Sequence, residues 1–195
     1  MANMPRRQML TRALVLPLMA GVSVAGASSI THAGSRSKVL VAYFTRTGNT
    51  RLIATQIARA LDATLFQIMP AQAYPVDYEA QVVQAESERE RGYEPTLRET
   101  VPDLPSYETV FLGFPIWGMT APAAIRAFLS QHNLSEKTLI PFITHGGYGL
   151  GRSLAVVEEH APGARLIAGF SKECDQERET LRQVTDFLVS IDGLR

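Results

Sequence analysis

Apolar and polar residues alternate along the chain in blocks that predict strands and helices in turn. Short runs rich in Val, Ile, Leu and Phe have the length of buried strands, and they occupy residues 38–44, 64–68, 109–114, 138–144 and 164–170. Apolar residues at helical spacing lie between or after these runs and predict helices at residues 49–61, 122–129, 153–160 and 181–191. Strands that alternate with helices predict a parallel sheet covered by helices on both faces.

The first 33 residues have a different pattern. They contain Arg6, Arg7 and Arg12, no acidic residue, and an apolar stretch over residues 13–27 that ends in small residues. This stretch is too short for a membrane span of about 20 residues. The pair Arg6-Arg7 resembles a twin-arginine signal, although Pro5 stands where Ser or Thr is usual. We therefore expect residues 1–33 to be a cleaved signal peptide and the mature protein to be periplasmic or otherwise exported.

A polar loop between the first strand and the first helix has the chemistry of a phosphate site. A helix N-terminus offers unpaired N–H groups and a positive dipole end, a glycine lets the backbone approach, and threonine hydroxyls donate hydrogen bonds. A Walker motif is absent, so a phosphate monoester fits better than a nucleoside triphosphate. The predicted phosphate-binding residues are Thr45, Arg46, Thr47, Gly48, Asn49 and Thr50.

The motif Thr-x-Thr-Gly-Asn-Thr after the first strand resembles the FMN phosphate loop of flavodoxins, and the resemblance covers residues 37–192. Two further segments follow the third and fourth predicted strands, where flavodoxins place the loops on either side of the flavin ring. The resemblance implies an FMN cofactor and a flavodoxin-like α/β domain: a doubly wound, five-stranded parallel sheet of order 2-1-3-4-5 in three α/β/α layers. It adds these cofactor-binding residues: Pro115, Ile116, Trp117, Gly118, Thr144, His145, Gly146, Gly147, Tyr148 and Gly149.

The resemblance also implies roles for these loops. Trp117 is expected to stack on one face of the flavin and Tyr148 to cover the other, while Gly118 offers a backbone group to N5. A core position is the alternative for Trp117. His145 either tunes the redox potential or only caps the end of the strand. No metal site is predicted, and Arg152 interrupts the glycine spacing that a dinucleotide site would need.

The second crossover, residues 69–108, is longer than one helix and two turns require. Its charged residues, with Val82 and Val83, predict one mostly solvated helix, and its prolines predict an extended return. Two interpretations stay open. The segment is either a plain charged crossover, or an excursion in which Tyr74, Tyr78 or Tyr93 partly covers the flavin or shapes the approach of a partner.

Charge and cysteine content limit the function classes. Removing residues 1–33 leaves 16 Lys and Arg against 19 Asp and Glu, a formal charge of −3, with no basic patch for nucleic acid. Cys174 is the only cysteine, which excludes an intramolecular disulfide. The membrane is expected to matter only for export.

These features favour a flavodoxin-like redox protein but leave its partner open. A carrier of electrons to a partner protein and an NAD(P)H-dependent quinone or flavin reductase with a small-molecule acceptor both fit. The weak negative charge favours the small-molecule acceptor slightly, because docking on a basic partner needs a strongly acidic surface. A non-redox ligand-binding module that has lost the flavin is a further alternative. A receiver domain is excluded because Thr45, not Asp, ends the first strand.

Overall fold

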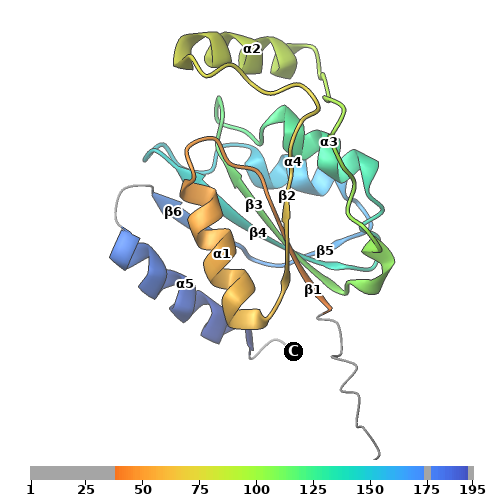
Figure 1. Ribbon diagram of the computed structural model, residues 1–195, viewed down its shortest axis with the longest axis vertical. Helices are drawn as coiled ribbons and strands as arrows, with labels where there is room; N and C mark the ends of the chain where they lie inside the picture. The colour runs from red at the N-terminus through yellow and green to blue at the C-terminus, as the bar shows by residue number, and fades with distance from the viewer. Residues whose placement is uncertain (1–37, 174–176, 193–195) are drawn as a thin grey trace, which may run out of the picture. The chain divides into compact units, whose positions relative to one another are not determined.

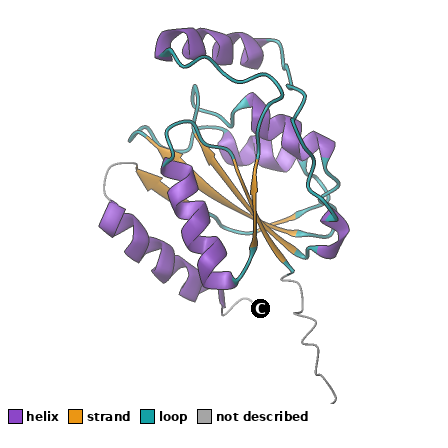
Figure 2. Ribbon diagram, viewed as in Figure 1, coloured by secondary structure: helices purple, strands orange, loops and turns teal. Residues whose placement is uncertain are grey.

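One parallel sheet forms the centre of the fold (Figures 1 and 2). The structure is a computed structural model that describes residues 38–173 and 177–192, all within the unit Arg36–Arg195. The strands run in the order β2-β1-β3-β4-β5, and β6 also pairs with β4, every pair being parallel. The predicted order 2-1-3-4-5 is thus confirmed. The strands are β1 (Val39–Tyr43), β2 (Thr64–Gln67), β3 (Thr109–Pro115), β4 (Thr138–His145), β5 (Arg165–Leu166) and β6 (Phe170–Glu173).

Helices cover both faces of this sheet, which confirms the three-layer arrangement. α1 and α5 lie on one face, and α3 and α4 lie on the other (Figure 1). No helix in the described residues is long and apolar enough to cross a lipid bilayer. The predicted signal peptide and Cys174 lie outside the described residues. The helices are α1 (Asn49–Leu61), α2 (Tyr78–Glu90), α3 (Ala123–Gln131), α4 (Ser153–His160) and α5 (Glu177–Asp192), with a short 3-10 turn at Leu104–Ser106.

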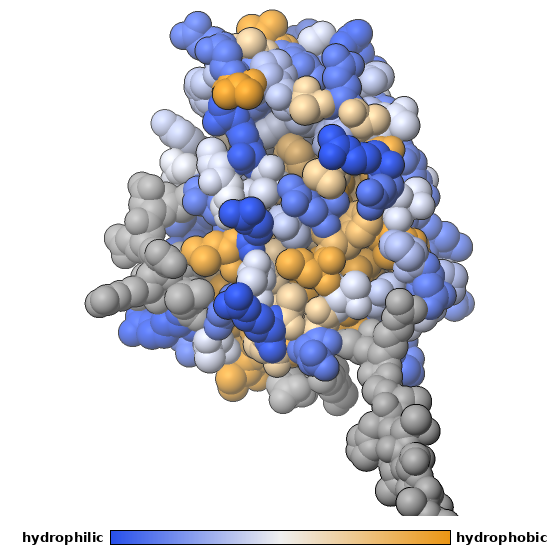
Figure 3. All heavy atoms as spheres, viewed as in Figure 1, coloured by the Kyte–Doolittle hydropathy of each residue, from blue (hydrophilic) through white to orange (hydrophobic). Residues whose placement is uncertain are grey.

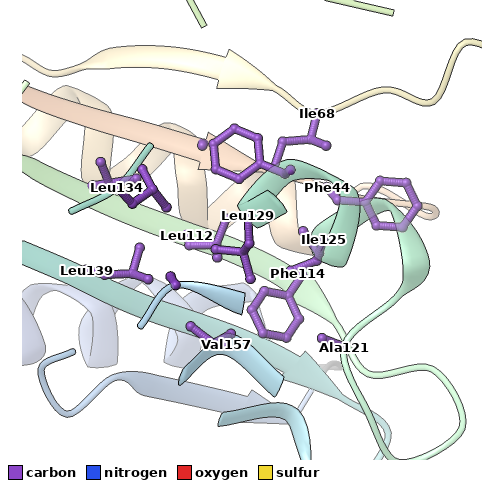
Figure 4. Packing of buried hydrophobic residues seen from close by; sticks show 14 of the residues in the cluster. Phe44, Ile68, Leu112, Phe114, Ala121, Ile125, Leu129, Leu134, Leu139 and Val157 are labelled. Atoms are coloured by element: carbon purple, nitrogen blue, oxygen red, sulfur yellow. The ribbon is translucent and has the colours of Figure 1, made fainter. Parts of the chain in front are cut away.

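The central strands β1, β3 and β4 are buried on both faces, because successive side chains point to opposite sides of the sheet. Leu40 and Leu112 face α3 and α4, and Figure 4 shows Leu112 packed beside Leu129 of α3. Val41 and Phe111 face α1 and α5 on the other side. Full burial of each such side chain contributes about 1.5–3 kcal/mol. These three strands therefore form the rigid base from which the functional loops project.

The fifth strand differs from its prediction. A continuous strand over 164–170 is wrong, because β5 and β6 are separate short segments that both pair with β4. Between the two pairings β4 advances from Leu139 to Phe142, while the partner chain advances one residue further, from Leu166 to Phe170. This extra residue is a β-bulge. We attribute the bulge to Pro141. Its backbone points toward the β5 and β6 edge, as that of Leu139 does, but proline has no N–H to donate to the neighbouring strand.

The second crossover folds as its sequence predicts, with one helix and an extended return. The outgoing and returning segments pair at an antiparallel bridge between Pro70 and Leu97, so the excursion closes on itself. The returning chain buries Leu97, Val101 and Leu104 in the core. In the space-filling view the surface that α2 contributes is mostly hydrophilic with a few hydrophobic residues (Figure 3). The predicted solvated helix is confirmed.

Candidate functional site

The loop between β1 and α1 presents backbone N–H groups and hydroxyls at a helix N-terminus. Gly48 is the N-cap residue and has a φ of 96°, a left-handed conformation that glycine adopts without strain. No side chain caps α1, and its first turn contains no acidic residue. The N–H groups of that turn and the positive end of the helix dipole are therefore available to an anion.

Threonine hydroxyls hold this loop in shape and join it to the end of β4. The Thr45 Oγ1 accepts a hydrogen bond from the Gly48 N–H at 3.1 Å. The hydroxyls of Thr50 and Thr144 lie 2.9 Å apart, and both side chains are buried. When Thr144 donates in this pair, the Thr50 hydroxyl is free to donate to a ligand. The geometry is thus compatible with the predicted phosphate role, and Thr47 is exposed beside it.

A cavity of about 550 Å³ lies where β1, β3 and β4 end, a size typical of small-molecule sites. The topology explains this convergence, because the carboxyl ends of neighbouring parallel strands meet at one edge of the sheet. Most predicted site residues line the cavity: Thr45, Arg46, Thr47, Asn49, Thr50, Pro115, Ile116, Trp117, Gly118, Thr144, His145 and Gly146.

Four predicted residues are not among those that line this cavity: Gly48, Gly147, Tyr148 and Gly149. Gly48 shapes the phosphate loop from its N-cap position. Tyr148 is 84% exposed, so the structure does not bring it to the cavity wall. Gly147 donates its N–H to His145 Nδ1 at 3.2 Å, which closes a tight turn at the start of the glycine-rich loop. The covering role of Tyr148 stays a prediction.

Trp117 separates two cavities. It is half-buried and packs edge-on against Phe44 and Tyr74, with ring centres 5.2 Å and 4.8 Å away. Trp117 lines both the cavity described above and a second cavity of about 440 Å³. Trp117 starts a turn closed by hydrogen bonds with Thr120, in which Gly118 and Met119 both have positive φ. The Trp117 side chain is therefore held at the rim of the core, between the two cavities.

α2 forms a wall of the first cavity that the sequence did not identify. The residues it contributes recur at helical spacing and occupy one face. That face mixes aromatic, aliphatic, amide and charged side chains, so an analysis of apolar periodicity could not single it out. Of this face, the sequence suggests a role only for Tyr78, as one of the three tyrosines that could cover the flavin. The residues are Tyr78, Gln81, Val82, Ala85, Glu86 and Arg89.

Hydrogen bonds to its two ends hold α2 in place. Asp77 caps the N-terminal end by accepting from the Ala80 N–H at 2.8 Å. At the other end, the buried Arg126 of α3 donates to the carbonyl oxygens of Glu88 and Tyr93, at 3.3 Å and 3.0 Å. The Glu88 carbonyl also accepts from the Tyr93 N–H, so the guanidinium adds a second donor there and ties this end of α2 to α3. α2 is thus anchored to the domain although its outer face is solvated.

The Glu88 carboxylate connects α2 to the rings around Trp117. It accepts hydrogen bonds from the Tyr74 hydroxyl at 2.9 Å and from Gln84 at 2.8 Å, and it is itself buried. Burial and the neighbouring carboxylate raise the pKa of Tyr74, so its hydroxyl stays protonated and donates. Tyr74 in turn packs on Trp117. The position of α2 and the position of Trp117 therefore depend on one hydrogen-bonded group.

Comparisons with known proteins agree with this geometry. A flavodoxin family model matches residues 38–187. A solved structure assigned as a flavoprotein from Bacteroides eggerthii is 31% identical, with a TM-score of 0.67, and the match covers 79% of this chain and 99% of that one. One from Bacteroides uniformis is 28% identical, with a TM-score of 0.67 and coverage of 77% and 99%.

A more distant structure shows the same fold. A flavoprotein from Lactobacillus acidophilus, solved in complex with FMN, is 20% identical, with a TM-score of 0.62 and coverage of 69% and 93%. No curated protein matches the chain.

Proposed function

Because the chain belongs to the flavodoxin family, we propose that it is an FMN-binding redox protein that works outside the cytoplasm. The observation that carries the proposal is the single cavity in which the phosphate loop meets the loops after β3 and β4. A phosphate and a flat ring need two different kinds of surface. The cavity offers hydroxyl and N–H donors at one loop and the half-buried Trp117 at another.

The donor set fits an anionic phosphate. Thr45, Thr47 and Thr50 supply hydroxyls, the first turn of α1 supplies N–H groups, and no carboxylate belongs to this loop. Trp117, Gly118 and His145, which line the same cavity, would contact the flavin ring. Bound FMN supplies reversible electron or hydride transfer. The role of the protein is to bind and orient it and to limit the access of water.

Binding of FMN rather than riboflavin tests this assignment. Titration with each, followed by flavin fluorescence, should give much tighter binding of FMN, because the loop donors all serve the phosphate. Thr47→Ala should weaken FMN by about 1.5–3 kcal/mol, the value of a hydrogen bond to a charged group, which is roughly tenfold or more in affinity. Riboflavin affinity should not change in this variant. Equal affinities for FMN and riboflavin in the wild type would contradict the assignment of this loop as a phosphate site.

Colour and a donor assay separate the remaining functions. Yellow purified protein that releases FMN on heating excludes a module that has lost the flavin. Anaerobic addition of NADPH or NADH then distinguishes the two redox functions. In a reductase the flavin is reduced at once and loses its yellow colour, whereas in a carrier it stays oxidised until a partner protein reduces it. The formal charge of −3 after removal of residues 1–33 favours a small-molecule acceptor, because it gives only weak steering toward a basic partner.

A further inference from the structure

We propose that α2 is part of the cofactor site: Gln81 accepts a hydrogen bond from bound flavin nucleotide, and Arg89 stabilises its reduced form. The proposal rests on the proposed function and deepens it, because it adds a helix from the long crossover to the loops of the site. Gln81 and Arg89 both line the cavity, and they lie on the same face of α2.

Gln81 has a hydrogen-bonding capacity that the described residues do not use. Its side chain is 3% exposed and lines the cavity, yet its Oε1 has no hydrogen-bond partner among them. A buried acceptor without a partner destabilises a protein, and native structures rarely retain one without a reason. A ligand that brings an O–H or N–H group into the cavity removes this cost. Gln81 is therefore placed to recognise a ligand rather than to support the fold.

Arg89 lies directly against the loop that follows β3. Its Nη1 occupies the space that a Cβ at position 118 would fill, so the guanidinium packs on the Gly118 peptide. Glu86, one turn earlier on α2, is 3.4 Å from Arg89 Nη2 and more exposed. The Arg and Glu residues that line the cavity are Arg46, Arg89 and Glu86. A guanidinium beside the flavin ring lowers the free energy of the reduced, anionic form.

The direction of α2 assigns each residue to a part of the cofactor. At the N-terminal end of the helix, the Arg46 guanidinium of the phosphate loop lies 5.4 Å from the centre of the Tyr78 ring. At the other end, Arg89 contacts the loop of Gly118. The helix thus runs from the phosphate end of the cavity to the ring end. Gln81, one turn from Tyr78, would then meet the ribityl hydroxyls of a bound FMN, and Arg89 would meet its ring.

Gln81→Leu separates recognition from stability. The variant should bind FMN about five- to tenfold more weakly, since it loses one hydrogen bond. The stability of the FMN-free protein should be unchanged or higher, because an unpaired polar group has been replaced by an apolar one. Gln131→Leu is the matched control, because Gln131 does not line the cavity. It loses the hydrogen bond to the Pro95 carbonyl oxygen, so it should reduce stability and leave FMN affinity within about twofold.

Arg89→Gln tests the charge. Its reduced FMN should bind about tenfold more weakly relative to oxidised FMN, which lowers the two-electron potential by about 30 mV. Arg91→Gln, at the C-cap of the same helix and outside the cavity lining, should leave the potential unchanged. Potentials are measured at constant ionic strength by equilibration with a reference dye.

The outcomes are distinguishable. Wild-type FMN affinity in Gln81→Leu, or an equal shift of potential in Arg89→Gln and Arg91→Gln, overturns the role of α2 and leaves the proposed function standing. Wild-type protein that binds no FMN overturns the proposed function and this inference together.

Discussion

At the scale of single residues, Trp117 is the position where a cofactor role and a core role predict different results. It is the only tryptophan in the chain, and it lines the cavity. In Trp117→Ala we expect the quenched flavin fluorescence to recover in part and FMN to bind more weakly, because stacking contributes about 0.5–1.5 kcal/mol beyond buried area. Reduction of the flavin should become easier, since an electron-rich ring disfavours the anionic reduced form.

A tryptophan that serves only the core would behave differently. Its truncation would cost about 3–5 kcal/mol of stability and leave the redox potentials of the remaining bound flavin unchanged. Potentiometry and urea unfolding of the same variant separate these outcomes. The edge-on contacts of Trp117 with Phe44 and Tyr74 make some loss of stability expected in either case, so the potential is the decisive measurement.

His132 gives the fold a dependence on pH. Its Nε2 accepts from the Val101 N–H at 3.0 Å, its Nδ1 donates to the Phe128 oxygen at 2.8 Å, and both bonds require the neutral ring. Burial lowers the pKa of His132 below its ordinary value of 6.5, although the bond to Phe128 opposes the shift. As pH falls below 6.5, the unfolded chain binds a proton that the folded chain resists. Stability should then fall by up to about 1.4 kcal/mol per pH unit.

Urea unfolding at several pH values checks this prediction. His132→Gln should be less stable than the wild type at pH 7.5, but should lose less additional stability on acidification. His160→Gln serves as the control for removal of a histidine from a helix end, where Nδ1 contacts the Val156 oxygen. A wild-type acid dependence retained in His132→Gln would show that other groups cause it.

At the scale of elements, the bulge between β5 and β6 depends on a close backbone approach. A Cβ at Gly169 would overlap with the carbonyl oxygen of Pro141, and neither backbone can move without disturbing β4. Gly169→Ala should therefore destabilise the domain by about 1–3 kcal/mol. Gly146→Ala is the stability control, because no atom lies within 4 Å of its added Cβ. Thermal unfolding of both variants tests the difference; equal midpoints would mean that the bulge accommodates the methyl group.

At the scale of the whole molecule, the N-terminal segment is predicted to direct export. Replacing Arg6 and Arg7 by Lys should strongly reduce the amount of exported protein, since the twin-arginine pathway recognises the pair itself. The mature N-terminus should lie near Gly34. Fractionation and N-terminal sequencing check both points. Normal export of the Lys pair would reject the twin-arginine assignment, and exported protein that begins at Met1 would reject cleavage.

The sequence by itself determined the fold class, the strand order through the family resemblance, and the loops at which to look for a ligand. These features depend on local information. Apolar runs of strand length and apolar residues at helical spacing identify elements one at a time, and Gly48 beside hydroxyl residues marks a phosphate loop within six positions. Most of the predicted residues in the three loops meet at one cavity, because parallel strands bring their carboxyl ends to the same edge.

Only the tertiary structure decided what depends on contacts between distant segments. The break between β5 and β6 follows from Pro141 on the neighbouring strand, which the apolar run of 164–170 does not reveal. The exposure of Tyr148 follows from the course of its loop. The charged residues of α2 predict a solvated helix, yet Gln81 and Arg89 line the cavity. A helix face that binds a polar ligand is itself polar, so its pattern matches that of a solvated face until the fold places it opposite the loops.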